Sequence, residues 1–201
     1  MSLLKNQLNG FEIILGSGSP RRKELLRRLE IDFALENLSV DESYPEELRG
    51  ADIALFLADL KSMAYPSTAL TNETILITAD TIVCLKDDVM GKPDDQAHAV
   101  EILRSLSGET HSVITAVCLR NRSKKKLFFN ETRVTFKTLS NEEINYYVER
   151  YKPFDKAGAY GIQEWIGFIG IEKIDGSYFN VMGLPVQQLY DELQQFISAI
   201  D

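Results

Sequence analysis

An α/β fold is the architecture that the amino-acid sequence predicts. Short apolar runs alternate along the chain with longer segments whose apolar residues recur at helical spacing, a pattern typical of a sheet covered by helices. No internal repeat, low-complexity tract or long linker interrupts this pattern, and 44% of the 201 residues are hydrophobic. The chain is therefore predicted to form a single packed domain over residues 1–201.

The first half of the chain is predicted to hold two buried strands and two amphipathic helices. The run FEIIL at 11–15 ends at glycines, and the run TILIT at 74–78 is equally apolar, so each is predicted to be a buried strand. Apolar residues recur every three or four positions in 20–30 and in 51–64, which predicts a helix in each segment.

The second half continues the alternation of strands and helices. Residues 132–138 alternate apolar with polar side chains, which predicts a half-buried strand. Ser140 and Glu143 have the spacing of a capping box, so a helix is predicted to begin there. The elements predicted from periodicity and run length are helices at 97–106, 140–150 and 185–200 and strands at 112–119 and 168–174.

Charge and hydropathy exclude several classes of protein. The net charge of −8 argues against a general nucleic-acid binder, which usually presents a basic face. No apolar run approaches the roughly 20 residues of a membrane-spanning helix, and residues 1–10 lack the features of a signal peptide. We therefore expect a cytoplasmic protein that binds neither nucleic acid nor membrane. The basic run at 122–126 is expected to be a solvated hairpin tip, with phosphate binding as the alternative.

Cysteines and histidines are too few and too scattered to suggest a zinc site. Cys84 and Cys118 belong to no CxxC pair and are expected to be buried thiols. The two histidines, His98 and His111, cannot form a histidine-based metal site alone. Any bound metal is therefore expected to have oxygen ligands, which favours Mg²⁺ or Mn²⁺.

A glycine-rich loop, GSGSPRRK at 16–23, joins the first predicted strand to the first predicted helix. Ser19 is a favoured N-cap and Pro20 a favoured first helical residue, so the backbone N–H groups there are predicted to bind an anion such as phosphate. Three cations follow in the first helical turn, where the helix dipole makes each unfavourable by roughly 0.3–1 kcal/mol. A bound anion would reverse that penalty; the alternative is that these side chains extend into water.

Five polar residues outside this loop are candidates for chemistry, and each also has a plain structural explanation. Asp80 follows the second predicted strand, where open α/β sheets bind ligands, although a turn aspartate fits as well. Glu42 lies in an acidic stretch typical of a solvated loop, Lys61 borders the apolar face of its helix, and Lys92 lies in a Gly-Lys-Pro turn. Gln163 ends a glycine-rich stretch; its amide can donate to and accept from a pyrimidine edge, or simply lie at the surface.

Six segments in a fixed order together resemble the Maf family of nucleotide pyrophosphatases. They are SGSPRRKELL at 17–26, ADTIV at 79–83, GKP at 91–93, LSGETH at 106–111, DKAGAYGIQ at 155–163 and NVMGLP at 180–185. The resemblance spans residues 13–193, nearly the whole chain. Two departures stand out: Gly16 replaces the usual alanine, and EWIGF at 164–168 replaces a turn that is rich in glycine in many members.

This resemblance implies an α/β fold whose elongated, mixed central sheet is flanked by helices, with two lobes and a cleft. It implies hydrolysis of a nucleoside triphosphate to the monophosphate and pyrophosphate, with Asp80 as the proton acceptor. Glu42, Lys61 and Lys92 match the other charged positions of the active site. We expect Asp80 and Glu42 to bind Mg²⁺ or Mn²⁺. Whether Asp80 acts as base, as metal ligand or as both is left open.

The substrate implied by the resemblance is a pyrimidine nucleotide. Arg21, Thr81 and Gln163 match the positions that separate the dTTP/UTP subgroup from the 7-methyl-GTP subgroup, which typically carries tryptophan at the first position and glutamate at the last. The expected substrate-binding set is completed by Ser17, Ser19 and Arg22. We therefore expect hydrolysis of dTTP and UTP as nucleotide-pool house-cleaning. The alternatives are 7-methyl-GTP or modified nucleotides as substrates, or a non-catalytic, nucleotide-binding regulator of cell division. A homodimer is left open.

Overall fold

The structure, a computed structural model, describes residues 3–198. Its strands are β1 (Glu12–Gly16), β2 (Ala34–Glu36), β3 (Thr74–Leu85), β4 (Asp88–Val89), β5 (Thr110–Arg120), β6 (Lys125–Phe136) and β7 (Ile171–Asp175). Its α-helices are α1 (Leu3–Gln7), α2 (Pro20–Arg28), α3 (Ala51–Ala64), α4 (Gln96–Leu106), α5 (Asn141–Tyr151), α6 (Trp165–Gly170), α7 (Tyr178–Met182) and α8 (Val186–Ser198). Short 3₁₀ helices are η1 (Ser67–Ala69) and η2 (Ala157–Ala159).

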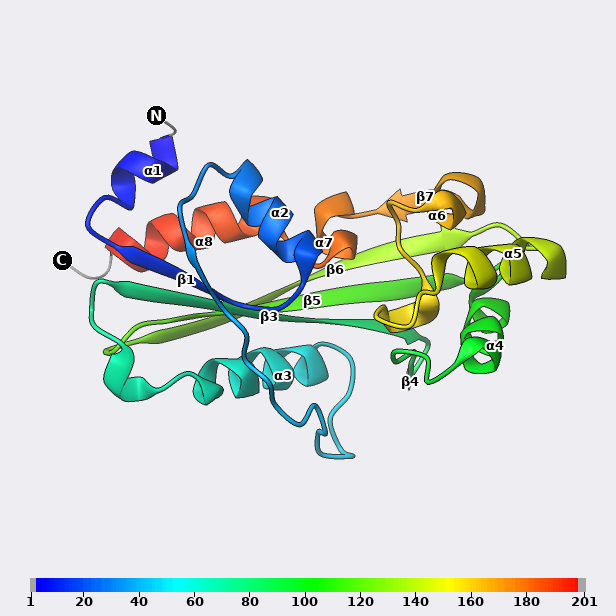
Figure 1. The fold of residues 1–201 in the computed structure, drawn as a ribbon, viewed down its shortest axis with the longest axis horizontal. Helices are drawn as coiled ribbons and strands as arrows, with labels where there is room; N and C mark the ends of the chain where they lie inside the picture. Colours follow the sequence, from blue (N-terminus) through cyan, green and yellow to red (C-terminus); the bar gives the residue numbers. More distant parts are fainter. Residues whose placement is uncertain (1–2, 199–201) are drawn as a thin grey trace. The chain divides into compact units, whose positions relative to one another are not determined.

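One mixed sheet organises the described residues (Figure 1). Its seven strands follow the order β2-β1-β3-β5-β6-β7, with β4 paired to β3. Strand β1 pairs in parallel with β2 and with β3, whereas β4 pairs antiparallel with β3 and β7 pairs antiparallel with β6. The predicted α/β fold with a mixed sheet flanked by helices is thereby confirmed.

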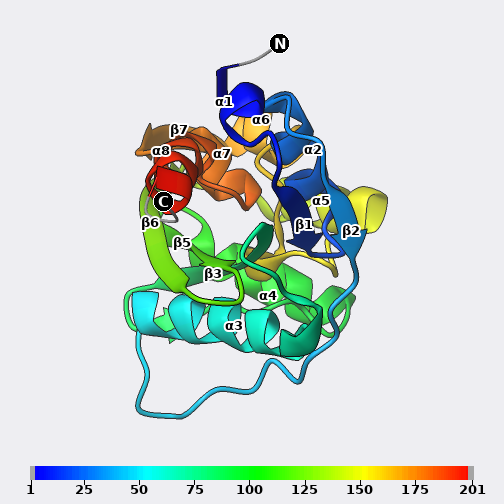
Figure 2. The ribbon, with the colours of Figure 1, turned by 90° about the vertical axis from the view of Figure 1, so that its left-hand side faces the viewer.

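The chain forms two compact units, the first of which comprises described residues 3–80, 115–130 and 183–198. In this unit α3 covers one face of the sheet, and α2 and α8 cover the other (Figures 1 and 2). The side chain of Thr78 in β3 donates a hydrogen bond of 2.7 Å to the carbonyl oxygen of Ala58, which joins α3 to the sheet.

The second unit comprises residues 81–114 and 131–182, and α4 packs in it against α5 and η2. Its core contains three rings, those of His111, Phe136 and Tyr160, with centroids 5.0 to 5.4 Å apart. Burial lowers the pKa of His111 to about 4, so this histidine is neutral at pH 7. Its Nε2 lies 2.8 Å from the hydroxyl of Tyr160.

The basic run at 122–126 connects β5 to β6, and Arg122, Ser123 and Lys125 are exposed there. Its three lysines also have partners. The contacts are Lys124 with the carbonyl oxygen and the ring of Phe196, Lys125 with Asp59 at 2.7 Å, and Lys126 with Glu192. These contacts tie the β5–β6 hairpin to α3 and α8, all within the first unit. The prediction of an exposed hairpin tip is confirmed, whereas the partners of its lysines were not predicted, because they lie on elements far away in the sequence.

Several predicted boundaries also differ from the structure. The strand predicted at 168–174 is wrong in its first part, because 165–170 form α6 and only the remainder lies in β7. An apolar run of this length fits a helix or a strand equally well. The helix predicted at 20–30 ends at Arg28, since Glu30 adopts a left-handed φ of 58°. The end of the last predicted helix, 199–200, lies outside the described residues.

The elements that the sequence pattern missed are short. They include α1, β2, β4 and α7, each of five residues or fewer, too short to show a period. Among residues 3–198, no helix combines the length and the apolar character needed to cross a membrane.

Candidate active site

The loop at 16–23 adopts the predicted turn from strand to helix. Ser19 is the N-cap of α2: its Oγ accepts a hydrogen bond of 3.4 Å from the backbone N–H of Arg22, and Pro20 opens the helix. The N–H of Ser19 donates in turn to Oγ of Ser17 at 3.2 Å. The predicted N-cap is confirmed, and the positive end of the α2 dipole lies at this loop, where an anion is stabilised.

Gly16, at the end of β1, lies where a larger residue would not fit. A Cβ atom there would come within 2.6 Å of Leu38 Cδ1 and within 2.8 Å of Thr78 Cγ2. The Thr78 side chain cannot turn away without losing its hydrogen bond to Ala58. The absence of a side chain at residue 16 therefore lets the loop of residues 37–50 begin close to β1.

Arg22 is not a solvated cation. Its Nε donates to the carbonyl oxygen of Gly183 at 2.8 Å, and its Nη1 lies 3.4 Å from Oγ of Ser17. Burial lowers the pKa of Arg22, an effect that the charges of Asp80 and Glu42 oppose. The extension of this side chain into water, which was the alternative for the basic loop, is wrong for Arg22. The Arg22 guanidinium therefore interacts electrostatically with both predicted catalytic acids, Asp80 and Glu42.

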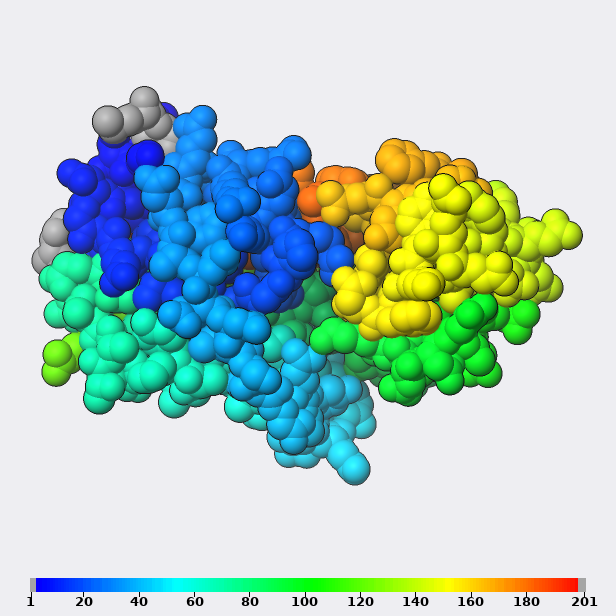
Figure 3. All heavy atoms as spheres, in the orientation of Figure 1, coloured from blue at the N-terminus to red at the C-terminus, as the bar shows by residue number. Residues whose placement is uncertain are grey.

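Lys61 joins the two acids. Its Nζ lies 2.5 Å from Oδ1 of Asp80 and 2.8 Å from Oε1 of Glu42. The side chains of Lys61 and Asp80 are only 12% and 10% exposed, whereas that of Glu42 is 41% exposed. Three elements supply these groups: the last turn of α3, the strand β3 and the exposed loop of 37–50, which protrudes from the first unit (Figure 3). Three of the four predicted catalytic residues thus meet.

The position of Asp80 within its strand corrects the sequence argument. Asp80 was expected just past the carboxyl end of a strand covering 74–78, yet β3 continues to Leu85. The strand continues beyond Asp80 because the residues after Thr81 are apolar and largely buried. Asp80 is therefore a buried acid in mid-strand rather than a residue of a turn, and burial of a carboxylate requires a charged partner such as Lys61.

Thr81, Lys92 and Gln163 belong to the second unit. Thr81 is half-buried in β3, whereas Lys92 and Gln163 are exposed. The GKP and DKAGAYGIQ segments are neighbours there, because the N–H of Gly158 approaches the carbonyl oxygens of Met90 and Gly91 at 2.9 and 3.1 Å.

Sequence reasoning missed a buried polar group beside Gln163. Tyr147, Lys156 and Glu164 interact with one another around the segment that ends in Gln163. Lys156 lies in the DKAGAYGIQ segment at 155–163, so the family resemblance could have identified it as a candidate. Tyr147 occupies an ordinary inward position of a helix, and Glu164 lies in the segment that departs from the family pattern, so neither carried a signal.

The donor set fits a magnesium or manganese ion bound together with substrate. Among residues 3–198, no group of three or more His, Cys, Asp or Glu side chains is arranged to hold a metal ion. Asp80 and Glu42, however, already share one cation, the Lys61 ammonium group. Mg²⁺ is commonly held by one or two carboxylates, with substrate phosphates and water as its other ligands.

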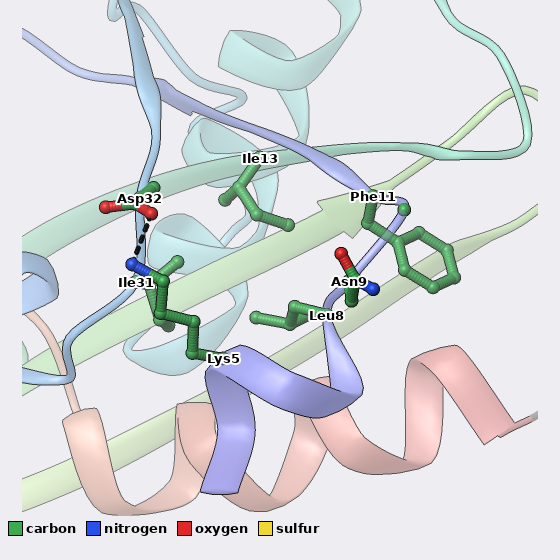
Figure 4. Close-up of a pocket in the computed structure, with 8 residues that line it drawn as sticks. Lys5, Leu8, Asn9, Phe11, Ile13, Ile31 and Asp32 are labelled. Carbon is green, nitrogen blue, oxygen red and sulfur yellow. Dashed lines mark ion pairs between the residues drawn. The ribbon is translucent and has the colours of Figure 1, made fainter. Parts of the chain in front are cut away.

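A separate pocket of about 180 Å³ lies between α1 and β1 in the first unit (Figure 4). Leu8, Ile13 and Ile31 line it, and an ion pair of 2.6 Å joins Lys5 to Asp32 at its edge. None of the predicted site residues lines this pocket. It is therefore not the candidate active site.

Fold and site together define an α/β protein equipped for an anionic, phosphorylated ligand. The family described as Maf-like protein matches residues 12–196, and the chain belongs to the Maf family. A protein of Bacteroides fragilis is 54% identical over 189 residues, covering 94% of this chain and 97% of the relative. A protein of Parabacteroides distasonis is 51% identical over 195 residues, covering 96% and 100%. One of Flavobacterium johnsoniae is 47% identical over 195 residues, covering 97% and 100%. Each is named dTTP/UTP pyrophosphatase.

Proposed function

We propose that this protein is a cytoplasmic nucleoside triphosphate pyrophosphatase that hydrolyses dTTP and UTP to the monophosphate and pyrophosphate, and so removes these nucleotides from the pool. The observation that carries the proposal is the position of the Lys61 ammonium group between Asp80 and Glu42. Both acids also interact electrostatically with Arg22, which belongs to the glycine-rich loop at the start of α2. Relatives of 47–54% identity that match almost the whole chain carry the name dTTP/UTP pyrophosphatase.

The proposed reaction gives a role to three charged site residues of the first unit, Asp80, Lys61 and Arg22. Asp80 accepts a proton from the water that attacks the α-phosphorus, and the bond from this phosphorus to the oxygen bridging to the β-phosphate breaks. Pyrophosphate leaves with that oxygen. Lys61 and Arg22 stabilise the negative charge that builds up on the phosphates, which is the main requirement of phosphoryl chemistry. Ser17 and Ser19 position the phosphates at the start of α2.

The remaining predicted residues keep the roles that the family resemblance implies. Lys92 contributes positive charge for the phosphates, and Arg21, Thr81 and Gln163 select the pyrimidine base. Asp80 and Glu42 would hold Mg²⁺ or Mn²⁺, which when bound supplies charge neutralisation and lowers the pKa of a coordinated water.

A product assay tests the proposed function. The protein is incubated with dTTP, UTP or 7-methyl-GTP in the presence of Mg²⁺ or Mn²⁺, and pyrophosphate is separated from orthophosphate. We expect pyrophosphate and the nucleoside monophosphate from dTTP and UTP. Release of orthophosphate and the diphosphate would contradict cleavage at the α-phosphate, and a preference for 7-methyl-GTP would contradict the base assignment.

A further inference from the structure

A four-residue turn carries Gln163 in the second unit. The N–H of Glu164 donates to the carbonyl oxygen of Gly161 at 2.9 Å, which closes the turn Gly161–Glu164. Gln163 is its third residue and is exposed, whereas Gly161 and Ile162 are buried. Because α6 begins directly after Glu164, the turn is fixed on one side by a helix. The direction of the Gln163 side chain therefore depends on what holds the rest of the turn.

A single hydroxyl group contacts both ends of this turn. The hydroxyl oxygen of Tyr147, a fully buried residue of α5, accepts a hydrogen bond of 3.0 Å from the N–H of Gly161. The same hydroxyl donates its proton to Oε2 of Glu164. Burial, reinforced by Glu164, raises the pKa of Tyr147, so the hydroxyl keeps the proton that it donates.

The carboxylate of Glu164 is held from a second side. Its Oε1 lies 3.2 Å from Nζ of Lys156, whose side chain is 10% exposed and also pairs with Asp155 at 2.7 Å. Each carboxylate oxygen of Glu164 thus has its own partner. Residue 161 must be small, since a Cβ atom there would lie 2.7 Å from Cδ of Glu164. Although Glu164 precedes α6, its side chain makes no capping hydrogen bond to that helix.

We propose that Tyr147 and Glu164 are positioning residues that fix the turn Gly161–Glu164 and thereby the direction of the Gln163 amide toward the pyrimidine base. This inference rests on the proposed function. An amide that must donate to one base atom and accept from its neighbour has to be held within about 0.5 Å, which requires buried support behind it. The Tyr147 hydroxyl supplies that support without contact to the base.

Tyr147→Phe is the main test, because it removes one oxygen atom and retains the buried ring. We expect kcat/KM for dTTP and UTP to fall roughly tenfold, mainly through a higher KM, while kcat changes less than threefold because Asp80 and Lys61 are untouched. The preference for dTTP over 7-methyl-GTP should fall by the same factor. Tyr151→Phe is the matched control: Tyr151 lies one turn further along α5, and its ring stacks on that of Tyr147 with a centroid distance of 5.0 Å. It should leave the preference unchanged.

Glu164→Gln provides a second variant if Tyr147→Phe folds poorly. The amide removes the charge that pairs with Lys156 and leaves one acceptor oxygen in place of two, so the present contacts of Oε1 and Oε2 cannot both be kept. We expect it to lower the preference for pyrimidines in the same direction. A drop in thermal stability with unchanged preference in both variants would show that the group only stabilises the fold and would overturn the inference.

Hydrogen exchange separates this inference from the proposed function, since it needs no substrate. In the protein without nucleotide, Tyr147→Phe should accelerate exchange at the amide of Gly161 about tenfold or more, whereas Tyr151→Phe should not. An unchanged exchange rate at Gly161 would refute the proposal that Tyr147 fixes the turn Gly161–Glu164, whichever nucleotide the enzyme hydrolyses. Wild-type protein that releases no pyrophosphate from dTTP would instead refute the proposed function, and with it the proposal that Gln163 in this turn recognises the base.

Discussion

Asp80→Asn is the substitution that tests the proposed chemistry most directly. It keeps the shape of the side chain and one acceptor oxygen for Lys61, but it removes the charge and the proton acceptor. We expect turnover of dTTP to fall by roughly 10²–10⁴-fold, the usual contribution of general acid–base catalysis. The fall should be larger if Asp80 also binds the metal ion.

The structure limits the cost to stability. Lys61 keeps its ion pair with Glu42 at 2.8 Å, so the substitution leaves no buried cation without an acid. The bond from Lys61 to residue 80 stays charge-assisted because the ammonium group keeps its charge, and only the attraction between the two opposite charges is lost. The expected loss is about 1 kcal/mol, or about 2–4 °C in Tm. A loss of activity of a hundredfold or more therefore cannot come from unfolding.

The assay is pyrophosphate release at saturating dTTP and metal, with a thermal melt on the same sample. Asp59→Asn is the matched control, because Asp59 pairs with Lys125 at 2.7 Å in the same unit and lies outside the candidate site. It should change Tm by a similar or smaller amount and leave turnover within about twofold. If Asp80→Asn retains most of the wild-type turnover, the assignment of Asp80 as the base is refuted.

Three further predictions follow from the same contacts. Arg22→Gln should weaken triphosphate binding about tenfold, and it should also lower Tm without nucleotide because the hydrogen bond to the carbonyl oxygen of Gly183 is lost. Thermal melts with and without dTTP measure both effects. An unchanged affinity for dTTP would show that Arg22 has only a structural role. Gln163→Glu should reduce kcat/KM for dTTP and UTP relative to 7-methyl-GTP by roughly 5–150-fold, since an ionised carboxylate cannot donate to a base carbonyl. If the ratios of kcat/KM between the three nucleotides stay constant, Gln163 does not contact the base. Trp165 is then the next residue to test. The free energy of unfolding should fall as the pH drops from about 6.5 to about 4, by up to about 3 kcal/mol, because His111 binds its proton in the unfolded chain before it does in the fold. Urea titrations across this range should lose that dependence in His111→Gln, and an identical slope in the variant would contradict the assignment.

Local signals in the sequence were enough for the ends of two helices. Ser19 caps α2 through its side chain, and Ser140 with Glu143 forms the predicted capping box of α5. Both predictions succeeded because the interacting groups are three residues apart, so the sequence contains the whole interaction. The same cannot be said of the strand predicted at 168–174, where an apolar run alone did not separate helix from strand.

The candidate site was predictable in its members more than in its contacts. The family resemblance pointed to Asp80, Glu42 and Lys61, but periodicity placed Lys61 only at the border of an apolar helical face. Its partners lie about twenty residues away in either direction, and only the fold brings them within 3 Å. Tyr147 was missed altogether, because an inward tyrosine of a helix looks like core until its hydroxyl is seen between two ends of a turn.

Gly16 carries a consequence for how this chain can be exchanged with its relatives. A methyl group at that position competes for space with Leu38, which lies four residues before Glu42. Residue 16 is therefore coupled to residues 38 and 78: alanine at residue 16 requires a smaller or differently oriented side chain at residue 38 and a shift of Thr78. A chimera that imports only alanine at residue 16 would push Leu38 away and move the start of the loop of residues 37–50. Glu42 would then be displaced from Lys61 because the backbone of its loop has shifted, although no charge in the site has changed.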